Sequence, residues 1–253
     1  MEKTFIDIHT HILPRIDDGA QSIDESMQML HTAYNEGIRT MIATPHYGME
    51  YQYTQKECEK DIVKLNNVIN NDARLKGMKV LRGNELLYHV DISQDIKQGL
   101  ANTLAGTNYV LVEFFTDAPL SSLEACAREM DMAGYRPIFA HVERYFCLYD
   151  DIGKLEWLKG LGALLQVNSL ELIELPQKES KGLFKRKNFD PDEERSRIAW
   201  QYVLSGLVDF IASDTHSNKW RPPIMKTAFD NIRQVGGDEL ADMLIQNAEN
   251  ILK

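Results

Sequence analysis

Short runs of β-branched and aromatic residues alternate with longer amphipathic stretches along the whole chain, and this alternation limits the folds that the chain can adopt. Seven of the short runs are expected to be strands: Phe5–His9, Arg39–Thr44, Lys79–Glu85, Tyr109–Phe114, Pro137–His141, Leu164–Asn168 and Asp209–Asp214. Strands that alternate with helices predict a parallel sheet, and about seven such units predict a barrel or a nearly closed one. Because the 253 residues match the length of one α/β barrel, we expect a single domain spanning residues 1–253.

The amphipathic stretches between these runs predict helices. The clearest one begins at Ser22, which forms a capping-box pattern with Glu25, and Gly37 stands where a C-terminal cap is expected. Five further helices are expected: Gln55–Asn70, Leu120–Ala133, Lys154–Gly160, Asp192–Ser205 and Glu239–Leu252. The stretch Leu175–Pro191 is irregular and is expected to be a surface loop of the same domain. It carries five basic residues: Lys178, Lys181, Lys185, Arg186 and Lys187.

The charge balance argues against one class of partner. The chain has 28 Lys and Arg against 38 Asp and Glu, a formal net charge of −10, whereas a nucleic-acid-binding protein needs a basic face. No run approaches the roughly 20 apolar residues of a membrane span, and the first residues contain no apolar export segment. The three cysteines, Cys58, Cys126 and Cys147, show no paired spacing, which is typical of a reduced chain. We therefore expect a cytoplasmic protein with no nucleic-acid partner and no membrane span.

Six of the seven expected strands end at or near a residue that can bind a metal ion. These residues are His9, His11, His46, Glu85, Glu113, His141, Asp214 and His216. Because the carboxyl ends of barrel strands share one face, we expect these side chains to gather there. In His9-Thr10-His11 the two imidazoles are separated by one residue, so on a strand they point the same way, and Asp214-Thr215-His216 repeats this spacing. Histidine and carboxylate ligands without cysteine favour Zn, Mn or Fe.

Other polar residues lie close to these strand ends. Either Asp17 or Asp18, in the loop after the first strand, is a candidate ligand, and a turn or a cap is the alternative role. Glu113 is a candidate to bridge two ions. Arg144 follows His141 and Arg221 follows His216, and a guanidinium beside a metal cluster suits phosphate oxygens. Two histidines fall outside the pattern and are expected to be ordinary: His31 and His89.

Seven motifs together resemble those of the PHP (polymerase and histidinol phosphatase) superfamily: DIHTHILPRIDDG, TPHY, GNELLY, LVEF, AHVERY, QVNS and ASDTHSNKWRPP. Within it, the chain is similar to the bacterial manganese-dependent protein-tyrosine phosphatases of capsule and exopolysaccharide operons. The resemblance extends from about Asp7 to Pro223 and, more loosely, to the end. It implies a distorted TIM-like (β/α)₇ barrel with two or three divalent ions, manganese first and iron or zinc next. The implied ligands are His9, His11, Asp18, His46, Glu85, Glu113, His141, Asp214 and His216.

The resemblance also implies a reaction. A hydroxide bridging the metal ions would attack phosphorus, while Arg144 and Arg221 hold the phosphate and neutralise its developing charge. The implied substrate is a phosphotyrosine protein, the tail of a bacterial tyrosine kinase of capsule synthesis. A cysteine-based tyrosine phosphatase is excluded, because it needs an arginine six positions after its cysteine. The three cysteines are followed at that position by Lys64, Met132 and Gly153.

Two loops leave the natural substrate open. Tyr47, Tyr51 and Tyr53 follow His46, and we expect Tyr47 to contact the aromatic leaving group, although a loop that packs on its own aromatic rings would have the same composition. The basic residues of Leu175–Pro191 suit an acidic, multiply phosphorylated tail, but a solvated loop explains them too. The oligomeric state is also open.

Three other functions are compatible with parts of this pattern. A PHP phosphatase of small esters, such as histidinol phosphate, would use the same metals with another pocket. A metal-dependent amidohydrolase would carry a carboxylated lysine or a carboxylate at a mid-barrel strand end, the region of Glu85 and Glu113. A catalytically silent binding module is the third alternative, and the intact ligand set argues against it.

Overall fold

The computed structural model describes residues 4–48, 51, 54–176 and 191–253. Its nine strands lie side by side in parallel pairs. They are β1 (Phe5–Thr10), β2 (Ile38–Ala43), β3 (His46–Tyr47), β4 (Lys79–Arg82), β5 (Glu85–Leu87), β6 (Tyr109–Glu113), β7 (Arg136–Phe139), β8 (Leu164–Asn168) and β9 (Phe210–Ala212). Each of the seven expected runs therefore contains a strand.

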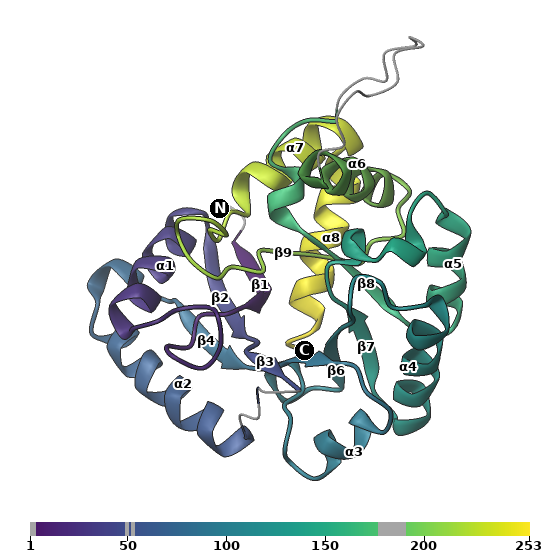
Figure 1. The fold of residues 1–253 in the computed structure, drawn as a ribbon. Coiled ribbons are helices and arrows are strands. Elements are labelled where there is room, and N and C mark those ends of the chain that lie inside the picture. Colours follow the sequence, from purple (N-terminus) through teal and green to yellow (C-terminus); the bar gives the residue numbers. More distant parts are fainter. Residues whose placement is uncertain (1–3, 49–50, 52–53, 177–190) are drawn as a thin grey trace.

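The strands form one curled sheet. Their order is β1-β2-β4 in one part and β3-β5-β6-β7-β8-β9 in the other, and β2 continues into β3 as β4 continues into β5. The segment after β9 returns to β1, because Asp214 donates its N–H to the carbonyl of His9 (3.0 Å) and His11 donates to that of Thr215 (2.9 Å). Helices surround this sheet in Figure 1. The expected distorted (β/α)₇ barrel is confirmed.

One expected strand is interrupted. Residues 79–85 were expected to be continuous, but pairing breaks between β4 and β5 at Gly83 and Asn84. A Cβ atom on Gly83 would lie 2.9 Å from the Ile42 side chain, so only glycine allows this approach to β2. Asn84 is buried, donates to the carbonyl of Pro45 (2.9 Å) and accepts the N–H of Asn102 (2.8 Å). These bonds hold the offset that starts β5 at Glu85.

The helices largely follow the prediction. They are α1 (Ile23–Asn35), α2 (Gln55–Asn70), α3 (Ile92–Lys97), α4 (Leu120–Ala133), α5 (Ile152–Gly160), α6 (Pro191–Leu204), α7 (Lys226–Gly236) and α8 (Asp238–Asn250). The prediction missed α3 and α7. At α1 the Ser22 hydroxyl accepts the N–H of Glu25 (3.1 Å), but the Glu25 carboxylate accepts that of Gln21 (2.9 Å) rather than that of Ser22. The expected capping box is therefore only half formed.

Two apolar clusters fill the molecule. The larger one joins the sheet to the surrounding helices. The smaller, which we call the interior cluster, consists of Ile8, Ile42, Leu104, Leu111, Ile138, Ala140, Phe210, Ala212, Ala248 and Ile251. It takes residues from five strands and from the end of α8, the yellow helix that runs behind β1 and β9 in Figure 1. Burial of each large side chain stabilises the fold by about 1.5–3 kcal/mol.

Two further expectations, on membrane spans and on the cysteines, can be compared with the described residues. No helix in them combines the length and the apolar composition that crossing a bilayer requires. Cys58, Cys126 and Cys147 are free thiols, as their spacing predicted. The basic residues between 178 and 187, as well as Tyr53, lie outside the described residues.

Candidate metal centre

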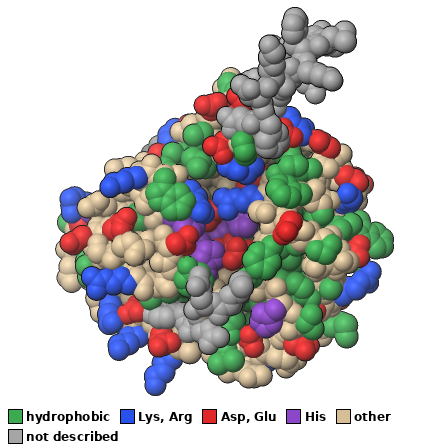
Figure 2. Space-filling view, in the orientation of Figure 1, with side chains coloured by type: hydrophobic (Ala, Val, Ile, Leu, Met, Phe, Trp, Pro, Cys, Tyr) green, Lys and Arg blue, Asp and Glu red, His purple; other side chains and the backbone are tan. Residues whose placement is uncertain are grey.

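The nine expected ligands come together at the carboxyl ends of the strands. His9 lies in β1, and His11 and Asp18 lie in the loop after it. His46 and Glu85 are the first residues of β3 and β5, so the breaks after β2 and β4 place them on the rim. The remaining four ligands stand at or just after the ends of β6, β7 and β9: Glu113, His141, Asp214 and His216. Figure 2 shows histidine side chains gathered in the middle of this face.

The ligand atoms form three adjacent groups, and within each group they lie within 4.8 Å of one another. The first group is His11, Asp18, His46 and His216; the second is His9, His11, Glu85 and Asp214; the third is His46, Glu85 and Glu113. His141 adjoins the last two groups, with its Nε2 2.9 Å from Glu85 Oε1. Glu85 belongs to two of these groups and Glu113 to one, so Glu85 is a second candidate, beside Glu113, to bridge two ions.

The imidazoles of the first strand converge as their spacing predicted. His9 Nε2 lies 3.3 Å from His11 Nε2. The same nitrogen lies 3.1 Å from Glu85 Oε2 and 3.3 Å from Asp214 Oδ1. Four potential ligand atoms from three strand ends thus surround one small volume. No local sequence pattern requires this convergence; the curvature of the sheet produces it.

Two ligands have a left-handed backbone. The φ angles are 35° at His141 and 51° at Asp214. This conformation costs a residue with a Cβ roughly 1–2 kcal/mol, and such strain is concentrated at functional sites. Each residue stands two positions beyond the end of its strand, where the backbone turns away from the strand direction.

Several atoms of the cluster lack a hydrogen-bond partner, and this tests whether metal ions fit. Glu85 Oε2 and His216 Nε2 are buried and form no well-aligned hydrogen bond with any described residue, although other ligand atoms lie 3.1–3.2 Å away. A buried carboxylate oxygen that accepts no hydrogen bond is costly unless a nearby positive charge compensates it. Nitrogen and oxygen donors together suit divalent transition metals. The residues therefore fit a cluster of divalent ions.

The protonation of the metal-free cluster leads to the same conclusion. Burial lowers the pKa of His46, but the Glu85 carboxylate and hydrogen bonds to Asp18 and Glu113 raise it to about 12. Burial raises the pKa of Glu85, but the neighbouring histidines, His9 first, hold it well below its usual range. Because the pKa values of His9, His11 and His46 are raised, protons on these three histidines supply the positive charge that the carboxylates need. Metal ions would displace these protons, so binding should release them.

The two aspartates of the first loop have different positions. Asp18 is a member of the first ligand group. Asp17 stands behind it: its Oδ2 lies 2.7 Å from His11 Nδ1 and accepts the N–H of His46 (3.1 Å). A Cβ on Gly19 would meet the His11 carbonyl at 2.2 Å, so the loop needs a glycine there. Asp17 orients His11, as carboxylates behind metal-binding histidines do.

Gln166 supports two ligands from behind. It lies in the QVNS motif, but the sequence analysis gave it no role because β8 brings no residue of ligand type to the cluster. Its Oε1 accepts the N–H of His141 (2.9 Å) and lies 3.1 Å from His9 Nδ1. Its Nε2 donates to Asn168 Oδ1 (2.8 Å), and Asn168 Nδ2 donates to Asp214 Oδ2 (2.9 Å). The backbone N–H of His141 can only donate, so it determines which group donates and which accepts in each hydrogen bond of this series. The sequence offered one indication of this role: two amide residues, Gln166 and Asn168, alternate with apolar residues in β8.

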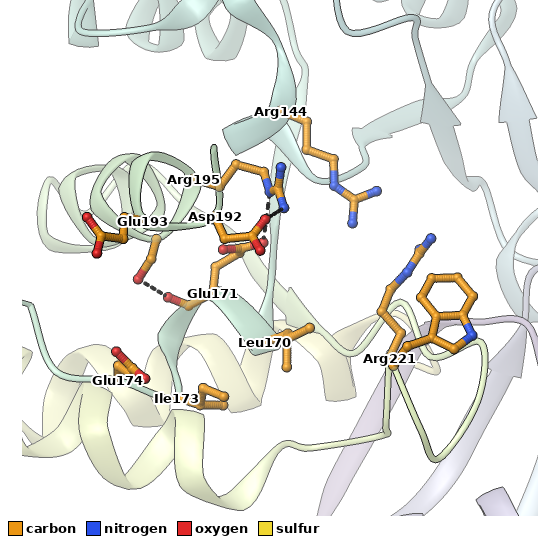
Figure 3. A pocket seen from close by; sticks show the side chains of 11 residues that line it. Arg144, Leu170, Glu171, Ile173, Glu174, Asp192, Glu193, Arg195 and Arg221 are labelled. Carbon is orange, nitrogen blue, oxygen red and sulfur yellow. Dashed lines mark hydrogen bonds and ion pairs between the residues drawn. The ribbon is translucent and has the colours of Figure 1, made fainter. Parts of the chain in front are cut away.

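The two arginines lie together at the edge of the cluster. Arg144 Nη2 and Arg221 Nη1 contact the same atom, Asp214 Oδ2, at 3.0 and 2.7 Å. In Figure 3 both side chains extend into the same cavity, with their guanidinium groups facing each other. This cavity measures about 670 Å³. Its lining residues are Arg144, Leu170, Glu171, Ile173, Glu174, Asp192, Glu193, Arg195, Ser196, Trp220 and Arg221.

The structure places Tyr47 away from the cluster, together with the two histidines that were expected to be ordinary. Tyr47 is only 8% exposed and belongs to the larger apolar cluster, and its hydroxyl donates to Asp95 (3.0 Å). It lines neither cavity that contains Arg144, so the predicted contact with substrate has no support in this geometry. His31 and His89 pair with Asp72 and Asp95 and belong to none of the ligand groups.

The fold and sequence are similar to those of known proteins. Tyrosine-protein phosphatase CpsB of Streptococcus agalactiae is 30% identical over 253 residues, with 98% of each chain covered. Tyrosine-protein phosphatase YwqE of Bacillus subtilis is 32% identical over 250 residues, covering 98% of this chain and 91% of the relative.

Solved structures agree. A crystal structure from work on YwqE of Bacillus subtilis and CpsB of Streptococcus pneumoniae, described as unique metal-dependent tyrosine phosphatases, matches with a TM-score of 0.85 at 31% identity, covering 98% of this chain and 94% of that one. The phosphotriesterase homology protein of Escherichia coli shares the fold alone (TM-score 0.55, 12% identity, 99% of each chain). The profile of the family Capsular polysaccharide synthesis, CpsB/CapC, matches residues 5–186 and 192–253. This chain therefore belongs to the CpsB/CapC family.

Proposed function

We propose that the protein is a metal-dependent protein-tyrosine phosphatase. The observation that carries the proposal is the position of two guanidinium groups, from Arg144 and Arg221, on the same oxygen of Asp214, a residue of the ligand cluster. A phosphoryl group at this edge would meet the ligand cluster on one side and two forked cations on the other. The tyrosine phosphatases similar to this chain cover nearly its whole length, which supports the same reaction here.

The cofactor in this proposal is a set of two or three divalent ions, and the three ligand groups favour three. Manganese is the first choice of metal, and iron and zinc are the alternatives. Glu85 would be shared between neighbouring ions, because it belongs to two groups and a carboxylate can bind two ions, whereas each imidazole would bind one ion through one ring nitrogen. When bound, the ions would supply Lewis-acid charge and a water molecule of lowered pKa. All three metals accept imidazole and carboxylate ligands, so their relative affinities for this site have to be measured.

The chain's own residues would hold the phosphate and stabilise its charge. Arg144 and Arg221 present several N–H donors beyond those that contact Asp214, and these would bind the phosphoryl oxygens as negative charge grows on them. Asp214 holds both guanidinium groups in place before substrate arrives. A tyrosine phenolate, with a pKa near 10 in water, leaves without strong help from a general acid.

We also propose the cellular setting. Residues 1–253 would form one domain in the cytoplasm, where free thiols persist. The substrate would be a phosphotyrosine protein, and the family's link to capsular polysaccharide synthesis favours the tail of a tyrosine kinase in that process. The net charge of −10 supports a partner other than nucleic acid.

The test is phosphate release from a phosphotyrosine peptide, after treatment with a chelator, with and without added Mn²⁺, Fe²⁺ or Zn²⁺. The wild type is compared with the double variant His9→Ala, His11→Ala. A matched control removes two histidines outside the cluster, His31→Ala and His89→Ala. We expect turnover that requires metal, is lost in the first variant and persists in the control.

The alternatives predict other outcomes. Turnover of histidinol phosphate but not of the peptide would favour a small-ester phosphatase with the same metals. Hydrolysis of a cyclic amide without release of phosphate from any ester would favour an amidohydrolase. Absence of all turnover from protein that still binds metal would overturn the proposal and favour a binding module.

A further inference from the structure

An exposed tryptophan borders the two arginines. Trp220 is 55% exposed, and it lines the same cavity as Arg144 and Arg221. Its ring centroid lies 4.6 Å from the guanidinium carbon of Arg221 and 5.3 Å from the ring centroid of His216. An exposed indole beside two guanidinium groups offers a surface on which an aromatic ring can pack.

The loop that carries Trp220 is held in a defined conformation. His216 and Ser217 both donate their N–H groups to the carbonyl of Arg221 (3.1 and 3.3 Å), and the Thr215 hydroxyl donates to it as well (2.8 Å). The N–H of Trp220 also approaches the Ser217 hydroxyl (3.4 Å). The position of the indole is therefore tied to that of the metal ligand His216 and the phosphate-binding Arg221.

The other two tryptophans of the chain differ from Trp220 in their polar contacts. Trp200 is buried and donates its indole N–H to the carbonyl of Glu174 (2.8 Å). Trp157 is 51% exposed and donates to the Glu124 carboxylate (2.7 Å). The indole N–H of Trp220 forms no hydrogen bond with any described residue. The donor, and the part of the ring surface that Arg221 and His216 leave uncovered, are thus available to a ligand in the cavity.

We propose that Trp220 forms the wall that binds the aromatic ring of the substrate and so selects aryl over alkyl phosphates. This inference rests on the proposed function. In an aryl phosphate the ring is bonded to the ester oxygen on phosphorus, so a phosphate whose other oxygens are held by Arg144 and Arg221 places the ring beside the cavity wall next to them. Leu170 and Ile173 line the same cavity and add apolar surface, as Figure 3 shows. Aromatic pairs favour offset or edge-to-face contact, which an indole face allows.

A second, smaller cavity is the alternative place for the aromatic ring of the substrate. It measures about 240 Å³, and Phe146 and Tyr149 line it with Arg144 but without Arg221. Their rings are 5.5 Å apart and nearly perpendicular. A ring seated there would leave the phosphate next to one arginine, whereas the larger cavity borders both. This difference favours Trp220.

The test uses binding, so that it does not depend on turnover. Metal-loaded protein is titrated by calorimetry with a peptide containing phosphonomethylphenylalanine, a non-hydrolysable phosphotyrosine analogue, and separately with inorganic phosphate, which has no ring. We expect Trp220→Ala to weaken binding of the peptide about tenfold, to leave phosphate binding unchanged, and Trp220→Phe to restore most of the loss. Trp157→Ala, with similar exposure, is the matched control and should change neither.

Three outcomes would overturn the inference. Equal loss of both ligands in Trp220→Ala would mean that the indole only positions Arg221. Loss of peptide binding in Phe146→Ala, with Trp220→Ala unaffected, would assign the ring to the smaller cavity. Wild-type protein that releases phosphate from phosphotyrosine yet binds the analogue no better than phosphate would remove the ring site but leave the phosphatase intact. A wild type without phosphatase activity would reject both proposals.

Discussion

The barrel has two chemically opposite regions that the same strands build. Along β1, Ile8 belongs to the interior cluster and the next residue, His9, belongs to the metal centre. At the end of β9, Ala212 belongs to the interior cluster and Asp214, two residues later, belongs to the ligand cluster. The interior cluster releases free energy by burying apolar surface, whereas the centre concentrates carboxylates, imidazoles and strained backbone. One region therefore stabilises the fold, and the other uses part of that stability to hold a reactive arrangement.

The largest expected effect comes from the shared carboxylate. Glu85→Gln keeps the shape of the side chain but removes a charge that two ligand groups share. We expect phosphate release to fall by about 10⁴-fold, equivalent to roughly 5 kcal/mol, because the metals that lower the pKa of water would no longer be held. Metal content and turnover are the measurements, and Glu124→Gln, on α4, is the control. Normal metal content with full activity in Glu85→Gln would contradict the role of Glu85 as a metal ligand in this region.

The next effect is on stability and depends on pH. Burial raises the pKa of Glu143 to about 8, although Arg144 opposes the shift. The folded protein thus holds this proton more tightly than the unfolded chain, so its contribution to the free energy of unfolding is full below pH about 4.5 and is lost as the pH rises through 8.

Glu143→Gln removes this titration while keeping an oxygen that can accept the N–H of Asn168. Between pH 5 and pH 9 the variant should gain about 3 to 5 kcal/mol of stability relative to the wild type. Urea denaturation of both metal-free proteins at the two pH values measures the difference. Parallel pH profiles would mean that Glu143 does not titrate in this range.

A change in the interior cluster should show the opposite pattern. Ile251 is 1% exposed and contributes to this cluster from beyond the end of α8. We expect Ile251→Ala to lower the free energy of unfolding by about 2 kcal/mol, near the lower limit for such truncations because the chain end can partly collapse. Turnover per metal-loaded molecule should stay within about twofold of the wild type. A large loss of turnover without loss of stability would contradict the view that the interior cluster stabilises the fold and takes no part in the reaction.

The smallest effect concerns the residue that links two ligands from behind. Gln166→Leu removes the oxygen that faces His9 and the His141 N–H, and it interrupts the bonds to Asn168. We expect metal affinity to fall about tenfold, as is typical for groups that orient ligands. Metal titration by calorimetry measures this, with Gln246→Leu on α8 as the control. Unchanged affinity would show that packing alone orients His9.

Much of the site could be predicted because its signals are local or repeated. Period-2 and period-3.6 patterns located strands and helices, and α2 and α4 have the predicted bounds. The ligand types recur at strand ends, so a parallel barrel was enough to bring them to one face. Two helices were missed: α3 has only six residues, and α7, which lies between a proline-containing loop and Gly237, was overlooked although its apolar residues recur at helical spacing.

The features that could not be predicted depend on contacts between distant segments. Asp17 and Asp18 are adjacent in sequence, and only the fold of their loop makes one face His11 and the other face His46 and His216. Tyr47 follows a ligand, yet the packing around β3 buries it.

The amino-acid sequence by itself determined the alternation of elements, the ligand types and their order around the rim, because these follow from residue chemistry and backbone periodicity. The tertiary structure alone decided which ligands are shared, that Gln166 supports His9 and His141, and that Trp220 stands beside both arginines. The physical reason is that hydrogen bonds and close contacts depend on ångström-scale positions. Those positions are set by the breaks and the closure of the curled sheet, which no single segment contains.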